Sequence, residues 1–209
     1  FGIPSWTLQF FFYWITMSFV RKSMAVCLLA VLVGYIARMG LFRPIDVELV
    51  SKDSLAIAFR RQRGSFMNIP VKYDEAYAAL SGVLSEDDLN AGVSFYFDKP
   101  GQVEEENLRW TVGYVISNPT DAVETSVKER GFDILHLPAS DAVRVVFPFR
   151  TPFSPFVGAL RSYKKLYKAA KPVVPSPAVE FYNEAQHTIE YTVFKGEEVN
   201  NMLSSLYVQ

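Results

Sequence analysis

The chain contains one pattern twice, and this duplication restricts the folds it can adopt more than any other feature of the sequence. Three short strings recur in the same order: "LAIAF" at 55–59 and "VRVVF" at 143–147, "YAAL" at 77–80 and "YKKL" at 163–166, and "VSFY" at 93–96 and "VEFY" at 179–182. The offsets are 88, 86 and 86 residues. Such strings are common in sheets, but three matches in one order at nearly one offset indicate an internal repeat.

Each copy of the repeat predicts the element order β-α-β-β. The first copy comprises a strand over 54–63, a helix over 71–84 and strands over 93–98 and 109–117. The second comprises a strand over 142–149, a helix over 154–170 and a hairpin over 178–194. The predicted fold class is therefore α+β. It is a duplicated β-α-β-β module over 46–195, with an antiparallel sheet and helices on one face.

Two further segments lie outside the repeat. Residues 117–131 predict a short capped helix, and a strand is expected directly after it. Residues 196–209 predict an amphipathic helix, which is expected to dock on the core, on the membrane or on a partner. Met202, Leu203 and Leu206 lie on its apolar stripe and are the candidates for docking a protein partner.

Residues 24–42 are long and apolar enough to form a transmembrane anchor before the domain. About 20 mostly apolar residues span a bilayer, and a basic side chain near the end of a span can reach the headgroups. The residues expected to define the anchor are Met24, Leu28, Leu32, Tyr35 and Arg38. The alternative is a cleaved signal peptide, which the sequence "GYIARMG" disfavours because it makes a poor cleavage site.

The preceding segment, residues 1–23, is rich in aromatic side chains and carries no charge before Arg21. Three interpretations are open. The segment forms a second membrane helix joined to the anchor by an "RKS" turn, or a helix lying in the membrane interface, or it is a non-native extension. If it is native, its Phe and Trp side chains require lipid or another protein around them.

The domain that follows the anchor is expected to face the cytosol. The only cysteine, Cys27, lies in the anchor, and no Asn-x-Ser/Thr acceptor sequence is present. Basic residues follow the anchor, as the positive-inside rule predicts for the cytosolic side, although Arg21 and Lys22 flank its other end. A net charge of −1 and a pI near 6.2 predict no nucleic-acid partner.

Catalytic and cofactor motifs are missing from the sequence. It contains no glycine-rich phosphate loop, nucleophile elbow, Cys-x-x-Cys pair or paired-histidine metal motif. His136, on an expected strand, and His187, beside an expected turn, are interpreted as structural or surface residues. We therefore predict a protein that is not an enzyme and that uses no metal and no cofactor.

The final hairpin contains a candidate ligand groove formed by Glu180, Tyr182 and Glu190. If the hairpin turns at about Ala185, alternation places these three residues on the face away from the helices. The residues expected to face the helices are Val179, Phe181, Ile189, Tyr191 and Val193. Glu180 and Glu190 would then lie opposite one another, and two carboxylates repel unless a cation, a proton or a ligand lies between them. The alternative is that both glutamates extend into water at a sheet edge.

Three runs of the sequence resemble the GyrI-like family of bacterial gyrase-inhibitory proteins and drug-responsive regulators: "RWTVGYVIS", "GFDILHLPASDAVRVVFPFRTPFSPFVGAL" and "AVEFYNEAQHTIEYTVF". The resemblance implies a duplicated β-α-β-β fold. It also implies an acidic residue in the groove between the halves that meets cationic drugs, a role that would fall to Glu180 with Tyr182. The anchor and the "FPF" strand further resemble reticulophagy receptors of the endoplasmic reticulum (ER), whose domain faces the cytosol. Those receptors carry a long acidic tail with an aromatic motif, which these 209 residues do not include.

The expected function is that of a non-enzymatic adaptor or receptor anchored in the ER membrane, and the resemblance implies a role in reticulophagy. The expected partners are membrane lipid and proteins of the ER membrane or the cytosol. Two alternatives stay open. One is an accessory subunit of a larger ER-membrane or contact-site assembly, such as a lipid-transfer complex. The other is a module that binds a small molecule or a lipid in the groove near Glu180.

Overall fold

The structure is a computed structural model that describes residues 5–172, 174 and 176–207; of residues 5–19 it describes the backbone only. Its centre is one eight-stranded sheet with the strand order β1-β6-β8-β7-β3-β4-β2-β5, in which every pair of neighbours is antiparallel. The strands are β1 Glu48–Lys52, β2 Leu55–Arg63, β3 Ala91–Tyr96, β4 Arg109–Ile116, β5 Asp133–Leu137, β6 Ser140–Pro148, β7 Ala178–Asn183 and β8 Thr188–Phe194. The α-helices are α1 Ser5–Arg38, α2 Ile69–Leu80, α3 Glu86–Leu89, α4 Asp121–Glu129, α5 Ser154–Ala170 and α6 Glu197–Ser205.

The two predicted copies of the β-α-β-β unit are β2-α2-β3-β4 and β6-α5-β7-β8. Each copy forms three adjacent strands, β6-β8-β7 on one side and β3-β4-β2 on the other. The two halves join through the central antiparallel pair of β3 and β7, which sets Ser94 opposite Glu180. The predicted duplication and the α+β class are therefore confirmed, and the interface between the halves lies at the middle of the sheet.

Helices α2 and α5 cover one face of the sheet, each over its own half. Proline lies in the first turn of both helices, where its missing N–H breaks no helical hydrogen bond. Under α2 the core includes Trp110 and Tyr114 of β4, and under α5 it includes Ile189 and Tyr191 of β8. Tyr73 of α2 contacts both clusters, so the two halves share one continuous apolar layer beneath the helices.

Helix α6 lies on the opposite face of the sheet, where it packs against residues of both halves such as Phe95 and Val179. Leu203 is fully buried there and Leu206 is 9% exposed. The expected amphipathic helix is therefore present, and of the three open docking options the structure selects the core. Leu203 and Leu206 are not available to a partner, which corrects the prediction that they form a docking surface with Met202. Met202 is half-buried against the same cluster.

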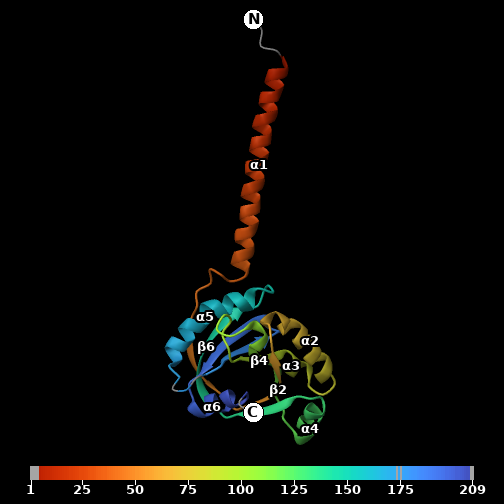
Figure 1. The fold of residues 1–209 in the computed structure, drawn as a ribbon, viewed down its shortest axis with the longest axis vertical. Helices are drawn as coiled ribbons and strands as arrows, with labels where there is room; N and C mark the ends of the chain where they lie inside the picture. Colours follow the sequence, from red (N-terminus) through yellow and green to blue (C-terminus); the bar gives the residue numbers. More distant parts are fainter. Residues whose placement is uncertain (1–4, 173, 175, 208–209) are drawn as a thin grey trace.

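Helix α1 projects away from the domain as one continuous helix of 34 residues (Figure 1). Its segment Val20–Arg38 is long and apolar enough to cross a bilayer, and none of it is covered by the domain. Of the three interpretations of residues 1–23, the one with a second membrane helix required a turn at "RKS", and the structure has none there, because the helix continues through Arg21 and Lys22 without a break. The helix ends at Arg38, before the end of the expected span at residue 42, and residues 39–42 form turns.

The short linker after α1 is fastened to the domain rather than free. Arg161 of α5 donates a hydrogen bond to the carbonyl oxygen of Gly40 at 2.6 Å, and Lys165 donates to that of Ile45 at 3.3 Å. Gly40 has a φ of +88°, and a Cβ there would meet the ring of Phe147. The close approach of the linker to β6 therefore requires glycine. As a result α5 is the domain helix nearest the end of α1 (Figure 1).

Candidate binding site around Glu180

Glu180 lies in the middle of β7, on the face of the sheet covered by α5. It pairs with Ser94 of β3 on one side and with Tyr191 of β8 on the other. The residue is only 5% exposed. A carboxylate at this depth loses the hydration that stabilises its charge, so its environment decides whether it is ionised.

Two tyrosine hydroxyl groups donate hydrogen bonds to the Glu180 carboxylate. Tyr163 of α5 donates to Oε1 at 2.7 Å, and Tyr182 of β7 donates to Oε2 at 2.5 Å. The hydroxyl of Tyr182 lies 3.0 Å from that of Tyr96 on β3, which extends the network into the other half of the fold. Both carboxylate oxygens are therefore satisfied by neutral donors.

Burial raises the pKa of Glu180 to about 7, and the hydrogen bonds from Tyr182, Tyr163 and Tyr96 oppose this rise only in part. In the part of the chain that the structure describes, no Lys, Arg or His side chain forms an ion pair with Glu180. Near neutral pH the site therefore holds a carboxyl group that is poised between its two protonation states and lacks a counter-ion.

Aromatic rings surround this carboxyl group, and five of them form what we call the tyrosine cage: Tyr73, Tyr96, Tyr163, Tyr182 and Tyr191. The ring centroids of Tyr73 and Tyr182 are 5.5 Å apart, as are those of Tyr163 and Tyr191. Burial raises the pKa of all five well above 10, so their hydroxyl groups stay protonated and act as donors. The cage offers π faces and neutral donors around a single ionisable acid.

The two halves of the fold contribute to the cage in nearly the same way. In the first half, Tyr73 of α2 hydrogen-bonds Ser94 of β3 at 3.0 Å. In the second half, Tyr163 of α5 hydrogen-bonds Glu180 of β7 at 2.7 Å. Ser94 and Glu180 are also direct partners across the central pair of strands. The strand positions of Ser94 and Glu180 are therefore equivalent in the two halves, whereas Tyr73 lies four residues before Tyr77, the counterpart of Tyr163 in the repeat, and only one half carries the acid.

The predicted pairing of Glu180 with Glu190 is wrong. In the structure Glu180 pairs with Tyr191, and Glu190 pairs with Phe181, so the two glutamates lie on opposite faces of the sheet. The physical reason is the turn, in which His187 adopts a φ of +50° and Asn183 accepts a hydrogen bond from the Gln186 N–H. This turn shifts the register by one residue and moves Glu190 to the other face.

The same shift reverses part of the predicted facing pattern. Val179 and Phe181 face away from α5 and join the cluster around α6, whereas Glu180 and Tyr182 face the helices. Ile189, Tyr191 and Val193 face the helices as predicted. The predicted groove on the open face is therefore replaced by a buried site beneath α2 and α5.

Glu190 has an ordinary structural role on its own face. Its carboxylate forms ion pairs with Lys52 at 2.5 Å and with Arg144 at 3.1 Å, and it accepts a hydrogen bond from Thr192 at 2.8 Å. These contacts tie β8 to β6 and to the edge strand β1. Since its charge is already balanced, Glu190 is not part of the candidate site.

The sequence analysis did not assign Tyr73, Tyr96, Tyr163 and Tyr191 to the site. The chemistry of the tyrosine side chain could have indicated that these residues belong to the site. A buried tyrosine needs a partner for its hydroxyl group, whereas phenylalanine does not. Several tyrosines at inward-facing positions of both copies therefore imply a shared buried acceptor, and Glu180 is the ionisable one.

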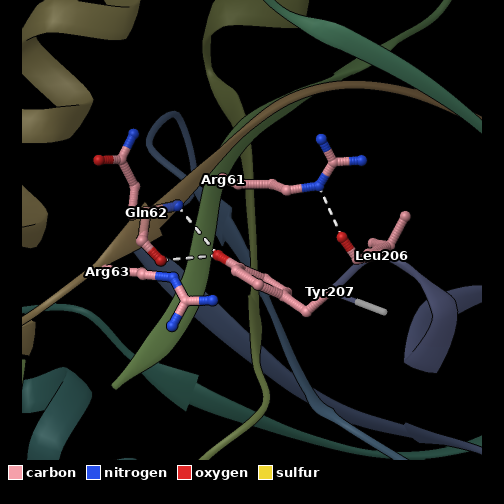
Figure 2. Close-up of a pocket in the computed structure, with 5 residues that line it drawn as sticks. All are labelled: Arg61, Gln62, Arg63, Leu206 and Tyr207. Carbon is pink, nitrogen blue, oxygen red and sulfur yellow. Dashed lines mark hydrogen bonds between the residues drawn. The ribbon is translucent and has the colours of Figure 1, made fainter. Parts of the chain in front are cut away.

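Away from the tyrosine cage, a concave region of about 310 Å³ is lined by Arg61, Gln62, Arg63, Leu206 and Tyr207. Figure 2 shows the Tyr207 hydroxyl directed at the backbone of Gln62, whose N–H donates to it at 3.0 Å and whose carbonyl oxygen lies 2.6 Å away. Arg61 donates to the carbonyl oxygen of Leu206 at 2.6 Å. The polar groups of this region are engaged in fastening the segment after α6 to β2.

Within the described residues, no group of three or more His, Cys, Asp or Glu side chains is placed to hold a metal ion. His136 forms a contact of 3.0 Å with Glu124 at the surface, and His187 lies in the β7–β8 turn. Neither histidine reaches the tyrosine cage.

No protein-family model matches the chain, and no curated protein is significantly similar to it. Several solved structures are similar in fold. The EcmrR C-terminal domain is 12% identical with a TM-score of 0.48, and the match covers 72% of this chain and 96% of that one. An uncharacterized conserved protein from Listeria innocua is 9% identical with a TM-score of 0.49, covering 71% and 91%. SAV2435 bound to tetraphenylphosphonium is 12% identical with a TM-score of 0.49, covering 73% and 96%. The duplicated β-α-β-β architecture of this chain follows from its own strand order and matching halves.

Proposed function

We propose that this protein is a membrane-anchored, non-enzymatic binding module whose tyrosine cage takes a hydrophobic organic cation at Glu180. One observation carries the proposal: a carboxyl group that is 5% exposed, enclosed by aromatic rings, and without a basic partner among the described residues. The resemblance to GyrI-like proteins, some of which bind cationic drugs through an acidic residue, supports the same assignment.

The chemistry of the cage favours a bulky cation with a dispersed charge. A buried carboxylate without a counter-ion is unfavourable, and a cation that enters the site restores its charge balance. Tyrosine rings attract cations through their π faces, by about 2 kcal/mol or more when water is excluded. A quaternary ammonium or phosphonium ion, or a protonated amine on an aromatic frame, combines a low dehydration cost with a large apolar surface. Such ions match both the acid and the rings.

The route into the cage lies between α2 and α5. Tyr73 of α2 and Tyr163 of α5 are half-buried, whereas Tyr182 and Tyr191 beneath them are buried. The side chains of Tyr163 and Tyr182, which are hydrogen-bonded to Glu180, occupy the space that a ligand would need. Entry of a cation therefore requires these two side chains to rotate, with α2 and α5 moving apart to admit it.

The test uses the full chain in mild detergent and a pair of probes with the same shape and opposite charge, tetraphenylphosphonium and tetraphenylborate. Fluorescence quenching should report saturable binding of the cation and much weaker binding of the anion. Glu180→Gln should lower the affinity for the cation at least tenfold, whereas Glu190→Gln on the same hairpin should leave that affinity unchanged. Equal binding of the two probes, or an unaffected Glu180→Gln variant, would overturn the proposal.

The anchor is the second part of the proposed function, with α1 spanning the ER membrane and the domain in the cytosol. The positive-inside rule and the resemblance to ER receptors support this topology. An Asn-x-Ser/Thr acceptor site placed in the loop at 100–106 tests it, since glycosylation occurs only in the lumen. Modification of that site would place the domain in the lumen, and extraction of the chain by alkaline carbonate would contradict a spanning helix.

An adaptor or accessory-subunit role in an ER-membrane assembly is a second candidate, and the length of α1 favours it. At 1.5 Å per residue its 34 residues extend about 51 Å, well beyond a hydrocarbon core of about 30 Å. The aromatic residues before Val20 would then need protein or interfacial lipid around them. Native purification followed by mass spectrometry tests this role. One stoichiometric membrane partner would support an accessory subunit, and capture of autophagy modifiers during starvation would support the receptor role.

A further inference from the structure

We propose that the junction between α1 and the domain is a binding site for an anionic phospholipid, whose phosphate headgroup is held by Arg38, Arg43 and Arg150. This inference rests on the part of the proposed function in which α1 spans a bilayer. It concerns a surface separate from the tyrosine cage and a ligand of opposite charge.

The site is a pocket of about 510 Å³ formed where the end of α1 meets the ends of β6 and β8. Arg38 and Arg43 approach it from the end of α1 and the linker, and Arg150 from the loop between β6 and α5. Phe147 and Phe149 of the β6 end also line it. A basic rim with aromatic residues beside it suits a headgroup that is followed by acyl chains.

The charge of this pocket is not balanced by the protein. All three arginines are exposed, and within the described chain none forms an ion pair with a carboxylate. The residues that line the pocket include no Asp and no Glu. Guanidinium groups bind phosphate oxygens in a bidentate manner, so three unpaired ones around a single pocket form an anion site.

The position of the pocket relative to the membrane identifies the anion. The segment Val20–Arg38 has 19 residues and a length of about 28 Å, close to the thickness of the hydrocarbon core. Arg38 therefore lies at headgroup level, and the bonds from Arg161 and Lys165 to the linker hold the domain against that level. A phosphate of the surrounding bilayer is then the nearest abundant anion.

Exposed apolar side chains follow Arg150 along the chain, at the start of α5 and in its first turns, and one more lies in the linker. Phe153, Phe156 and Leu160 are 56%, 70% and 72% exposed, and Phe42 in the linker is 67% exposed. Farther along the helix, the exposed residues Lys164 and Lys168 follow at helical spacing. Apolar side chains that enter the acyl boundary and lysines that reach phosphates are typical of helices lying in a membrane interface. This stripe would contact lipid while the arginines hold the headgroup.

The experiment titrates the full chain in mild detergent with dioctanoyl phosphatidic acid, dioctanoyl phosphatidylcholine and inorganic phosphate, and compares two double variants. Arg43→Gln/Arg150→Gln removes two rim charges and leaves Arg38 in the anchor. Lys128→Gln/Arg130→Gln removes two charges at α4, at the far end of the domain from α1 (Figure 1). We expect the pocket variant to bind phosphatidic acid at least about tenfold more weakly, and the α4 variant to bind it like the parent chain.

The remaining outcomes separate the sources of the phosphate and the underlying premises. Inorganic phosphate that binds as tightly as phosphatidic acid would make this a site for free phosphate and overturn the lipid assignment. Equal binding of phosphatidylcholine, or equal losses in both double variants, would also overturn it. Carbonate extraction of membranes tests whether α1 spans the bilayer, and the cation titration tests binding at Glu180, each independently of this pocket. A failure of either part of the proposed function can therefore be told apart from a failure at this pocket.

Discussion

The hydroxyl groups of Tyr96 and Tyr182 lie 3.0 Å apart, although the two residues are separated by 86 positions in the chain. They occupy the same place in the two copies, as the fourth residue of "VSFY" and of "VEFY". The contact thus joins the two halves across the central pair of strands, directly beside Glu180. A duplicated fold brings equivalent side chains together at its centre, and a single Ser-to-Glu difference between the copies gives that centre a charge.

The stability of the protein should fall as the pH rises through neutrality because of Glu180. Its pKa is raised from 4.5 to about 7 in the fold, so between these values the unfolded chain releases a proton that the folded chain retains. The resulting stability is fully present below pH 4.5 and is lost by about pH 8, which amounts to about 3 kcal/mol. Denaturant unfolding of the full chain in detergent between pH 4.5 and pH 8 measures this loss.

Glu180→Gln should remove most of this pH dependence, because an amide has no proton to release in that range. Glu190→Gln is the matched control, since it makes the same chemical change on the opposite face of the hairpin, where Lys52 and Arg144 balance the charge. The control should lose some stability and keep the slope between pH 5 and pH 7.5. An unchanged slope in the Glu180→Gln variant would assign the pH dependence to another group.

The affinity for an organic cation should rise about tenfold between pH 6 and pH 8, as the carboxyl group with a pKa of about 7 becomes ionised. Tyr163→Phe removes a donor that favours the ionised form, so its midpoint should move to higher pH. Tyr167→Phe is the control on the same helix, because that hydroxyl donates to Ser176 instead. Tetraphenylphosphonium titrations at several pH values measure these midpoints. A flat profile in the parent chain would exclude Glu180 as the counter-ion.

The sequence was sufficient to predict the duplicated frame because its evidence is redundant. The strings at 55–59 and 143–147 lie in the long strands β2 and β6, and those at 93–96 and 179–182 lie in the central pair β3 and β7. Alternation and helical spacing repeat in each copy, so an error in one is corrected by the other. The strand β1 Glu48–Lys52 was not predicted, because it lies outside the repeated strings and no second copy of its pattern supports it. It is an edge strand held by its pairing with β6 and by the ion pair between Glu48 and Arg144.

The site itself could be predicted only in part. Glu180 and Tyr182 were singled out, and the structure places them in one network. Their orientation was wrong because the register of a hairpin depends on its turn, and one residue of difference exchanges the two faces. The left-handed conformation of His187 is not evident from the sequence, since glycine or asparagine is usual at such positions. The register error also led to the inclusion of Glu190.

Gly158→Ala should destabilise the protein even though alanine is the better helix former. Helix α5 packs so closely on β8 that a Cβ at Gly158 would lie 2.3 Å from the hydroxyl oxygen of Tyr191. Tyr191 is fully buried and donates to the carbonyl oxygen of Pro155 at 2.7 Å, so it has no space to move. We expect a loss of about 2 kcal/mol, seen as a melting temperature lower by about 4–8 °C. Gly34→Ala, where no atom lies within 4 Å of the new Cβ, should cause no loss.

The only cysteine of the chain offers a direct measure of the anchor, because Cys27 lies in the middle of the segment Val20–Arg38. It is about 16 Å along the helix from Arg38, and the domain does not cover it. In intact ER microsomes a membrane-impermeant maleimide should therefore leave Cys27 unmodified until the sample is denatured. Val103→Cys adds a reference thiol in an exposed loop of the domain, which should react at once if that loop faces the cytosol. Rapid labelling of Cys27 in intact microsomes would contradict a spanning α1. Protection of both thiols until the membrane is permeabilised, with only the loop thiol reacting then, would retain the span and place the domain in the lumen.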